Sequence, residues 1–157
     1  MTGVQTCALP ISLLEVPLVA VTNEKYSLIG VDMRDSLTLN TLLQTVKVDE
    51  TKPTLLLSEV VLTYMGRSSC NRLIQWILDF FQECILCTYE QVLPDDGFGQ
   101  VMVAHFAKLG SPLKCIHQYP TGDSQVQRYT HLVRLRRVRM RWQDTLDASR
   151  ASICRSA

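Results

Sequence analysis

Three carboxylates follow short apolar runs of the chain, and this pattern can build a ligand site. Asp32, Glu59 and Glu90 each come directly after or at the end of such a run. Apolar runs without alternation are typical of strands buried on both faces. The carboxyl ends of parallel strands lie along one edge of a sheet, where open α/β folds bind ligands. We therefore expect the three acids around one crevice, although an exposed loop position or a structural ion pair explains Glu59 equally well.

Cys84 and Cys87 form a Cys-x-x-Cys pair, a pattern used in zinc and redox chemistry. No second pair stands at a zinc-like spacing, and no proline or glycine shapes the motif into a helix start. On an extended strand, residues three apart point to opposite faces. The pair is therefore interpreted as two structural cysteines of the core.

Other catalytic signatures are missing from the chain. His105, His117 and His131 are isolated, and the sequence has neither a Gly-x-Ser-x-Gly elbow nor a His-Glu-x-x-His helix. Gly97-Phe-Gly99 lacks the spacing of a phosphate loop and is better explained as a tight entry to a helix. Hydrolase, metalloprotease and metal-site interpretations therefore have little support.

The elements that would position the acids alternate along the chain. Apolar runs predict strands over 26–32, 53–59 and 84–90, and a strand or short helix over 13–20. Helical spacing and capping residues predict helices over 37–46 (cap Asp35 or Ser36), 70–82 (cap Ser68 or Ser69), 98–109 (cap Asp95 or Asp96, stop Gly110) and 123–132. This order predicts an α/β fold with a parallel sheet and helices on both faces.

Length and composition limit the classes of protein. The 157 residues allow one domain with a core, no run reaches the apolar length of a membrane span, and six scattered cysteines favour the reducing cytoplasm. Residues 134–157 contain seven arginines and two aspartates, which leaves nine basic and thirteen acidic residues in 1–133. This basic tail is either a nucleic-acid-binding arm or a disordered or frame-shifted end, and we favour the frame shift. Residues 1–12 resemble a translated sequencing adapter, so we expect a non-native leader.

Several stretches together resemble the leucine carboxyl methyltransferase family. They are Tyr-Ser-Leu-Ile-Gly-Val-Asp-Met-Arg-Asp at 26–35, Pro-Thr-Leu-Leu-Leu-Ser-Glu-Val-Val-Leu-Thr-Tyr-Met at 53–65, Tyr-Glu-Gln at 89–91 and Phe-Gly-Gln at 98–100. The resemblance covers about residues 13–132. Asp-Gly-Phe-Gly-Gln-Val-Met at 96–102, His-Phe at 105–106 and Gly-Ser-Pro-Leu at 110–113 are most similar to the tRNA wybutosine-synthesising branch. The branch that methylates the C-terminal leucine of the protein phosphatase 2A catalytic subunit is the alternative.

The resemblance implies a Rossmann-like fold that binds S-adenosylmethionine, here truncated at both ends. Asp32 and Met33 match the pair that lies along the adenosine part of the cofactor. Glu59 matches an acid of the cofactor site, and Tyr64 an aromatic near the methyl-transfer centre. The family's reaction-centre lysine and arginine, its Gly-rich turn, the acid after its second strand and its last strands have no counterpart. The wybutosine branch's C-terminal propeller has none either.

The implied reaction needs no general base, because an acceptor carboxyl with a pKa of about 3.5 is already ionised at neutral pH. The leading hypothesis is a fragment of a cytoplasmic enzyme that esterifies a modified guanosine side chain in tRNA. The first alternative has a protein C-terminal carboxylate as acceptor, and the second is a non-catalytic α/β interaction module. We expect the chain as written to bind the cofactor weakly or not at all, with neither metal nor membrane as a partner.

Overall fold

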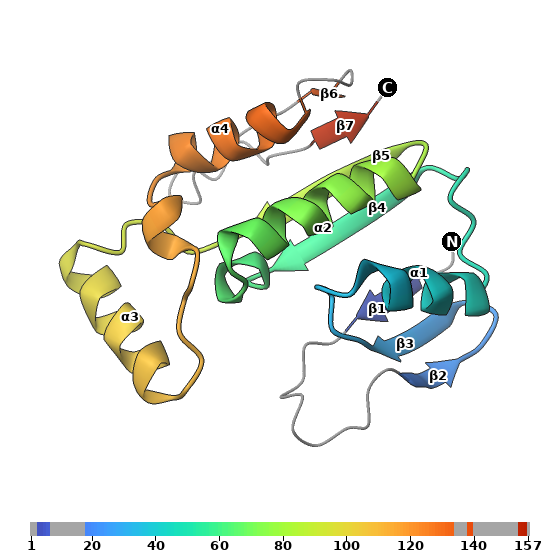
Figure 1. Cartoon of the computed structure of the whole chain (residues 1–157), viewed down its shortest axis with the longest axis horizontal. Coiled ribbons are helices and arrows are strands. Elements are labelled where there is room, and N and C mark those ends of the chain that lie inside the picture. Colours follow the sequence, from blue (N-terminus) through green and yellow to red (C-terminus); the bar gives the residue numbers. More distant parts are fainter. Residues whose placement is uncertain (1–2, 7–17, 134–137, 140–153, 157) are drawn as a thin grey trace. The chain divides into compact units, whose positions relative to one another are not determined.

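The computed structural model describes residues 3–6, 18–133, 138–139 and 154–156, which fall into two compact units, Met1–Asp49 and Glu50–Ala157 (Figure 1). The predicted leader lies outside the described residues except for 3–6, and the predicted tail except for 133, 138–139 and 154–156. No described helix is both long and apolar enough to cross a membrane. Each unit combines a small sheet with helices, so the mixed α/β class is confirmed.

The first unit consists of a three-stranded sheet and one helix. Strand β3 (Tyr26–Gly30) lies between β1 (Gly3–Thr6) and β2 (Leu18–Thr22), parallel to β1 and antiparallel to β2. The β2–β3 hairpin departs from the predicted all-parallel sheet. The side chain of Asn23 explains this turn, because its oxygen accepts hydrogen bonds from the amides of Lys25 and Tyr26, both at 2.8 Å.

Helix α1 (Ser36–Thr45) begins and ends with defined caps. Asp35 accepts a hydrogen bond from the amide of Thr38 at 3.1 Å, which confirms one of the two predicted caps. At the other end Lys47 has φ 58°, and the amides of Lys47 and Val48 reach carbonyls of the last turn at 2.9 Å. This is a Schellman ending with lysine where glycine is usual.

The second unit contains the strands β4 (Thr54–Glu59), β5 (Cys84–Tyr89), β6 (Val138–Arg139) and β7 (Cys154–Ser156). Its helices are η2 (Leu62–Tyr64), α2 (Arg67–Phe80), α3 (Gly97–Lys108), η3 (Ile116–Gln118) and α4 (Gly122–Val133). The sheet order is β4-β5-β7-β6. Strands β4 and β5 are parallel, as predicted, and α2 connects them and runs along them (Figure 1).

The prediction that β4 is buried on both faces is wrong. Leu55 is 68% exposed and Leu57 is 71% exposed, whereas the alternate residues Leu56 and Ser58 are half-buried. The described helices of this unit cover one face of the strand only, so helices on both faces of the sheet are not observed here. A run of leucines gives no alternation from which a bare face could have been foreseen.

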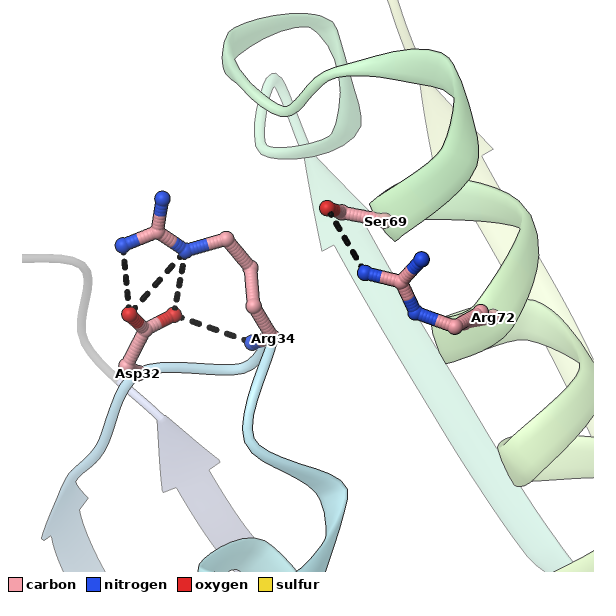
Figure 2. A network of polar contacts seen from close by, with 4 residues as sticks. All are labelled: Asp32, Arg34, Ser69 and Arg72. Carbon is pink, nitrogen blue, oxygen red and sulfur yellow. Dashed lines mark hydrogen bonds and ion pairs between the residues drawn. The ribbon is translucent and has the colours of Figure 1, made fainter.

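The predicted start of the second helix is also wrong. Helix α2 begins three residues early, with Gly66 as a cap that lacks a side chain, and its first backbone bond runs from Cys70 to Gly66 at 3.0 Å. Ser68 and Ser69 lie inside the first turn, where both hydroxyls accept hydrogen bonds from Arg72, at 2.7 and 3.3 Å (Figure 2 draws the Ser69 bond). The serines are therefore not caps.

Helix α3 confirms two predictions about its ends. The side chain of Asp96 accepts a hydrogen bond from the amide of Gly99 at 2.6 Å, and Gly110 ends the helix with φ 72°. The backbone comes so close to Gly99 that a β-carbon there would lie 2.0 Å from the carbonyl oxygen of Leu93. Only glycine fits this entry.

Candidate functional site

The carboxyl ends of β4 and β5 form one edge of the second unit's sheet. Glu59 is paired with Tyr89 in the parallel register, and Glu90 follows directly. Two of the three predicted acids therefore lie at one edge, as expected. Asp32 belongs to the first unit, and its place in the same crevice stays a prediction.

A strained residue carries the chain away from this edge. Val60 has φ 51°, in the left-handed region that a β-branched residue rarely adopts. Its amide donates to the carbonyl of Tyr89 at 2.8 Å, one residue beyond the regular ladder. Strain of this kind persists only where the surrounding contacts hold it, and it is common at functional sites.

The side chain of Glu90 holds the segment that follows. Its two carboxylate oxygens accept hydrogen bonds from the amides of Leu62 and Thr63, both at 3.2 Å, and both of those residues are buried. Burial raises the pKa of Glu90, and the two hydrogen bonds partly offset this effect. Glu90 therefore anchors η2, the short helix that carries Tyr64.

Tyr64 lies half-buried at the end of η2. Its ring meets Phe106 of α3 edge to face, with centroids 5.9 Å apart and an angle of 69°. Burial, and next the charge of Glu90, raise the pKa of Tyr64, so its phenol stays protonated at neutral pH. Tyr64 can donate a hydrogen bond or pack against a ligand, but it is unsuited to act as a base.

Glu59 is the acid of this edge that is free to meet a ligand. Glu59 is exposed, and its carboxylate makes no hydrogen bond or ion pair with the described residues. A carboxylate in this position accepts hydrogen bonds from hydroxyl, amino or amide groups. The position confirms that the strand ends at Glu59, and contact with a cofactor stays a prediction.

In the first unit, Asp32 and Met33 lie two and three residues beyond the end of β3 and are both half-buried. Figure 2 shows the carboxylate of Asp32 with the guanidinium of Arg34, with the shortest contact at 2.5 Å. The hydrogen bond from Arg34 lowers the pKa of Asp32. Because the side chains of Arg34 and Asp32 are 55% and 37% exposed, such a pair contributes little stability and can exchange for other partners.

A buried polar cluster beneath η2 was not predicted from the sequence. The thiol of Cys70 donates to the carbonyl of Leu62 at 3.0 Å, and the amide of Cys115 donates to the carbonyl of Thr63 at 3.0 Å. Arg128 of α4 is 4% exposed, and its guanidinium lies 4.5 Å from the ring centroid of Tyr119. An arginine in a helical stretch gives no sign of burial, and the cysteines lie far apart in sequence.

Neither cysteine of the Cys-x-x-Cys pair forms a disulfide with a described residue, and Cys84 is buried whereas Cys87 is half-buried. Within the described ranges there is no group of three or more His, Cys, Asp or Glu residues that could hold a metal ion.

Comparisons with known proteins bear out the resemblance. Residues 6–78 match the family described as Leucine carboxyl methyltransferase. The chain is 39% identical over 104 residues to a Rattus norvegicus protein named tRNA wybutosine-synthesizing protein 4, with 66% of this chain and 15% of that protein covered. The Homo sapiens protein of the same name is 38% identical over 104 residues, with the same two shares.

A second kind of relative is more distant. The Rattus norvegicus protein named Leucine carboxyl methyltransferase 1 is 32% identical over 106 residues, which cover 68% of this chain and 32% of that protein. The chain thus spans about 15% of the length of the wybutosine-synthesizing relatives and about a third of this one.

Proposed function

We propose that the chain forms part of an S-adenosylmethionine-dependent carboxyl methyltransferase, because residues 6–78 match the leucine carboxyl methyltransferase family. The observation that carries the proposal is the exposed carboxylate of Glu59 at the carboxyl end of a parallel strand. Open α/β sheets bind ligands at such an edge. We assign residues 13–132 to the methyltransferase domain and the reaction to the cytoplasm.

In each unit taken by itself, the residues present offer groups that the proposed cofactor can use. Glu59 offers two free acceptor oxygens, and Asp32 can exchange its exposed Arg34 partner for a donor of the adenosine part. Met33 supplies an apolar contact beside Asp32. When bound, S-adenosylmethionine supplies an electrophilic methyl group to the acceptor.

The chain's own contribution to catalysis is positioning. The acceptor carboxylate is ionised at neutral pH, so no proton has to be removed from it. Tyr64, kept protonated, orients the acceptor through its hydroxyl or ring, and Glu90 holds η2 so that Tyr64 stays in place. Accurate placement of reactants can supply a large part of a rate enhancement.

We propose tRNA carrying a modified guanosine as the acceptor, because the relatives at 38–39% identity are wybutosine-synthesizing proteins. The alternative acceptor is a protein C-terminal leucine, supported by the relative at 32% identity. The acceptor is the part of the proposal that rests on the relatives alone.

Cofactor binding is tested by titrating S-adenosylhomocysteine into the ¹⁵N-labelled chain and following the amide resonances. We expect weak binding that shifts the amides of Asp32, Met33 and Glu59. The variant Glu59→Ala should lose these shifts, and Glu83→Ala, an exposed acid at the opposite end of the strand pair, should keep them. No shifts, or shifts confined to other residues, would favour the interaction module. Saturable calorimetric binding at low micromolar cofactor would overturn the expectation that this chain binds weakly.

The acceptor is tested with two chimeras. Residues 18–133 replace the matching segment of the rat wybutosine-synthesizing relative, or that of the rat leucine carboxyl methyltransferase 1. Transfer of labelled methyl to tRNA by the first chimera alone supports the proposal, and transfer to a leucine-ended protein by the second alone favours the alternative. Two inactive but folded chimeras would contradict both.

A further inference from the structure

Helix α3 carries more apolar surface than its own unit covers. Of its twelve residues, Gly99 alone is fully buried, and in Figure 1 the helix stands apart from α2 and the sheet of the same unit. One face of the helix contacts the unit through Gly99 and through Phe106, whose ring meets Tyr64. A helix whose apolar residues extend around most of its circumference is normally covered on more than one side. The uncovered apolar residues of α3 therefore offer a surface to a partner.

These uncovered residues form one stripe along the helix. They recur at spacings of three and four, the helical repeat, and are Phe98, Val101, His105 and Leu109. Phe98 is 77% exposed, Val101 is 68% exposed and Leu109, the cap residue, is 62% exposed. Apolar residues that are exposed singly are ordinary, whereas a contiguous apolar stripe marks an interaction surface. We name these four residues the α3 stripe.

The two ends of the α3 stripe carry opposite charges. Asp95, just before the helix, has a side chain that is 85% exposed, and its ion pair with the exposed His117 is long, at 3.8 Å. Lys108, in the last turn, is exposed and makes no ion pair with the described residues. Asp96 is occupied as the helix cap, because it accepts the amide of Gly99. No other Asp, Glu, Lys or Arg lies between Asp96 and Lys108, so the stripe is negative at its start and positive at its end.

We propose that the α3 stripe is the contact between two copies of this chain, in which the two α3 helices pack antiparallel. A two-fold axis makes such a contact self-complementary, because each copy presents the same surface to the other. The axis places Phe98 of one copy opposite Leu109 of the other, and Val101 opposite His105. Both copies thereby cover the apolar residues that their own units leave exposed.

The charges favour a second copy over another kind of partner. In the antiparallel pair, Asp95 of each copy lies at the same end as Lys108 of the other, and the opposed helix dipoles also attract. A wholly acidic or wholly basic partner would match one end of the stripe and be repelled by the other end. A parallel pair would bring like charges together at both ends. The antiparallel pair is the arrangement that satisfies both ends.

The contact is small, and this sets the strength of the dimer. One pair of twelve-residue helices buries less than the roughly 1,200 Å² of the smallest stable interfaces. The dimer should therefore be transient, with monomer predominating in dilute solution. It rests on neither the cofactor nor the acceptor of the proposed reaction.

Sedimentation equilibrium of the full chain tests the dimer, over concentrations from about 10 µM to about 1 mM. The average mass should rise from one chain toward two chains. Phe98→Ala should weaken association about tenfold or more, because the dimer loses this side chain twice. Leu37→Ala in α1 is the matched control, since Leu37 is also 77% exposed, and it should leave association unchanged. Circular dichroism checks that both variants keep their secondary structure.

Three results would overturn the proposal. The first is a chain that stays monomeric over the whole range of concentration. The second is a dimer that Phe98→Ala and Leu37→Ala weaken equally. The third is a dimer that Phe98→Ala leaves intact and Leu57→Thr weakens, which would place the contact on the bare face of β4.

Reversal of charge tests the antiparallel arrangement. Asp95→Lys and Lys108→Glu should each weaken the dimer a few-fold at low salt, because each puts like charges at both ends of the pair. A mixture of the two variants should associate more tightly than either variant alone, since opposite charges then meet at both ends. Lys52→Glu changes the net charge equally at an exposed lysine before β4 and should have no effect. A mixture no tighter than the separate variants would refute the antiparallel arrangement.

Discussion

The entry to α3 leads to the sharpest stability prediction, which compares two glycines of one helical turn. A β-carbon at Gly99 would lie 2.0 Å from the carbonyl oxygen of Leu93, and 2.7 and 2.8 Å from the carbonyl carbon and Cα of Pro94. All three are backbone atoms, and the amide of Leu93 is itself held by Pro120 at 2.7 Å. Gly99→Ala must therefore displace the backbone, at a cost of about 3 kcal/mol, the upper end for overpacking.

The control is Gly97→Ala in the same turn, where a β-carbon meets nothing within 4 Å. Alanine there should change stability by about 0.5 kcal/mol or less, or raise it slightly. Urea unfolding followed by far-ultraviolet circular dichroism measures both variants. With a slope of about 1.5 kcal/mol per molar, Gly99→Ala should lower the midpoint by about 2 M.

Local opening of α3 offers a second measurement. If α3 opens before the rest of the unit, hydrogen exchange of its amides should rise in Gly99→Ala and stay unchanged in Gly97→Ala. Equal urea midpoints together with equal exchange would refute the tight contact between Gly99 and the segment of Leu93 and Pro94.

Three further predictions concern the helix ends and the anchor of η2. Lys47 and Gly110 both have positive φ at the end of a helix, so Lys47→Gly should raise the free energy of unfolding by about 1 kcal/mol and Gly110→Ala should lower it by a similar amount. Calorimetric Tm values of the two variants test both changes. Glu90→Ala leaves two buried amides without an acceptor and should cost about 2–5 kcal/mol in urea unfolding, whereas Glu59→Ala, at an exposed acid, should cost about 0.5 kcal/mol or less. Because the folded state raises the pKa of Glu90, the folded protein binds this proton more tightly, so stability should fall as pH rises from about 4.3 through the raised pKa. Glu90→Gln should flatten that part of the urea-midpoint profile, and an unchanged slope would contradict the shift.

The features that were predictable from sequence depend on a few neighbouring residues. Asp35 and Asp96 cap their helices through an amide three residues ahead, and Gly110 ends α3 with the positive φ that glycine allows. Glu59 ends its strand, and the strands β4 and β5, which α2 connects, are parallel. Each of these predictions follows from local chemistry, which the sequence displays directly.

The features that were missed depend on contacts that the sequence does not show. Arg128 has the residue type and spacing of a solvent-exposed helical arginine, yet it is buried against Tyr119. Lys47 adopts a left-handed backbone without the glycine that would signal it. The bare face of β4 was hidden because Leu55 and Leu57 are as apolar as the residues between them.

The candidate site is held by hydrogen bonds between main-chain groups and the end of the sheet, one to the carbonyl of Tyr89 and two to the side chain of Glu90, and this explains why residue types alone gave an incomplete account of it. Val60 continues the ladder by one bond to Tyr89 and then turns the chain, and Glu90 receives the amides of the helix that follows. One strand thus supplies the turn and its neighbour supplies the anchor, so the position of Tyr64 is fixed by the register of two strands. A functional residue placed in this way tolerates changes on the exposed face of β4 better than any change at Glu90, since the carboxylate of Glu90 accepts hydrogen bonds from the amides of η2.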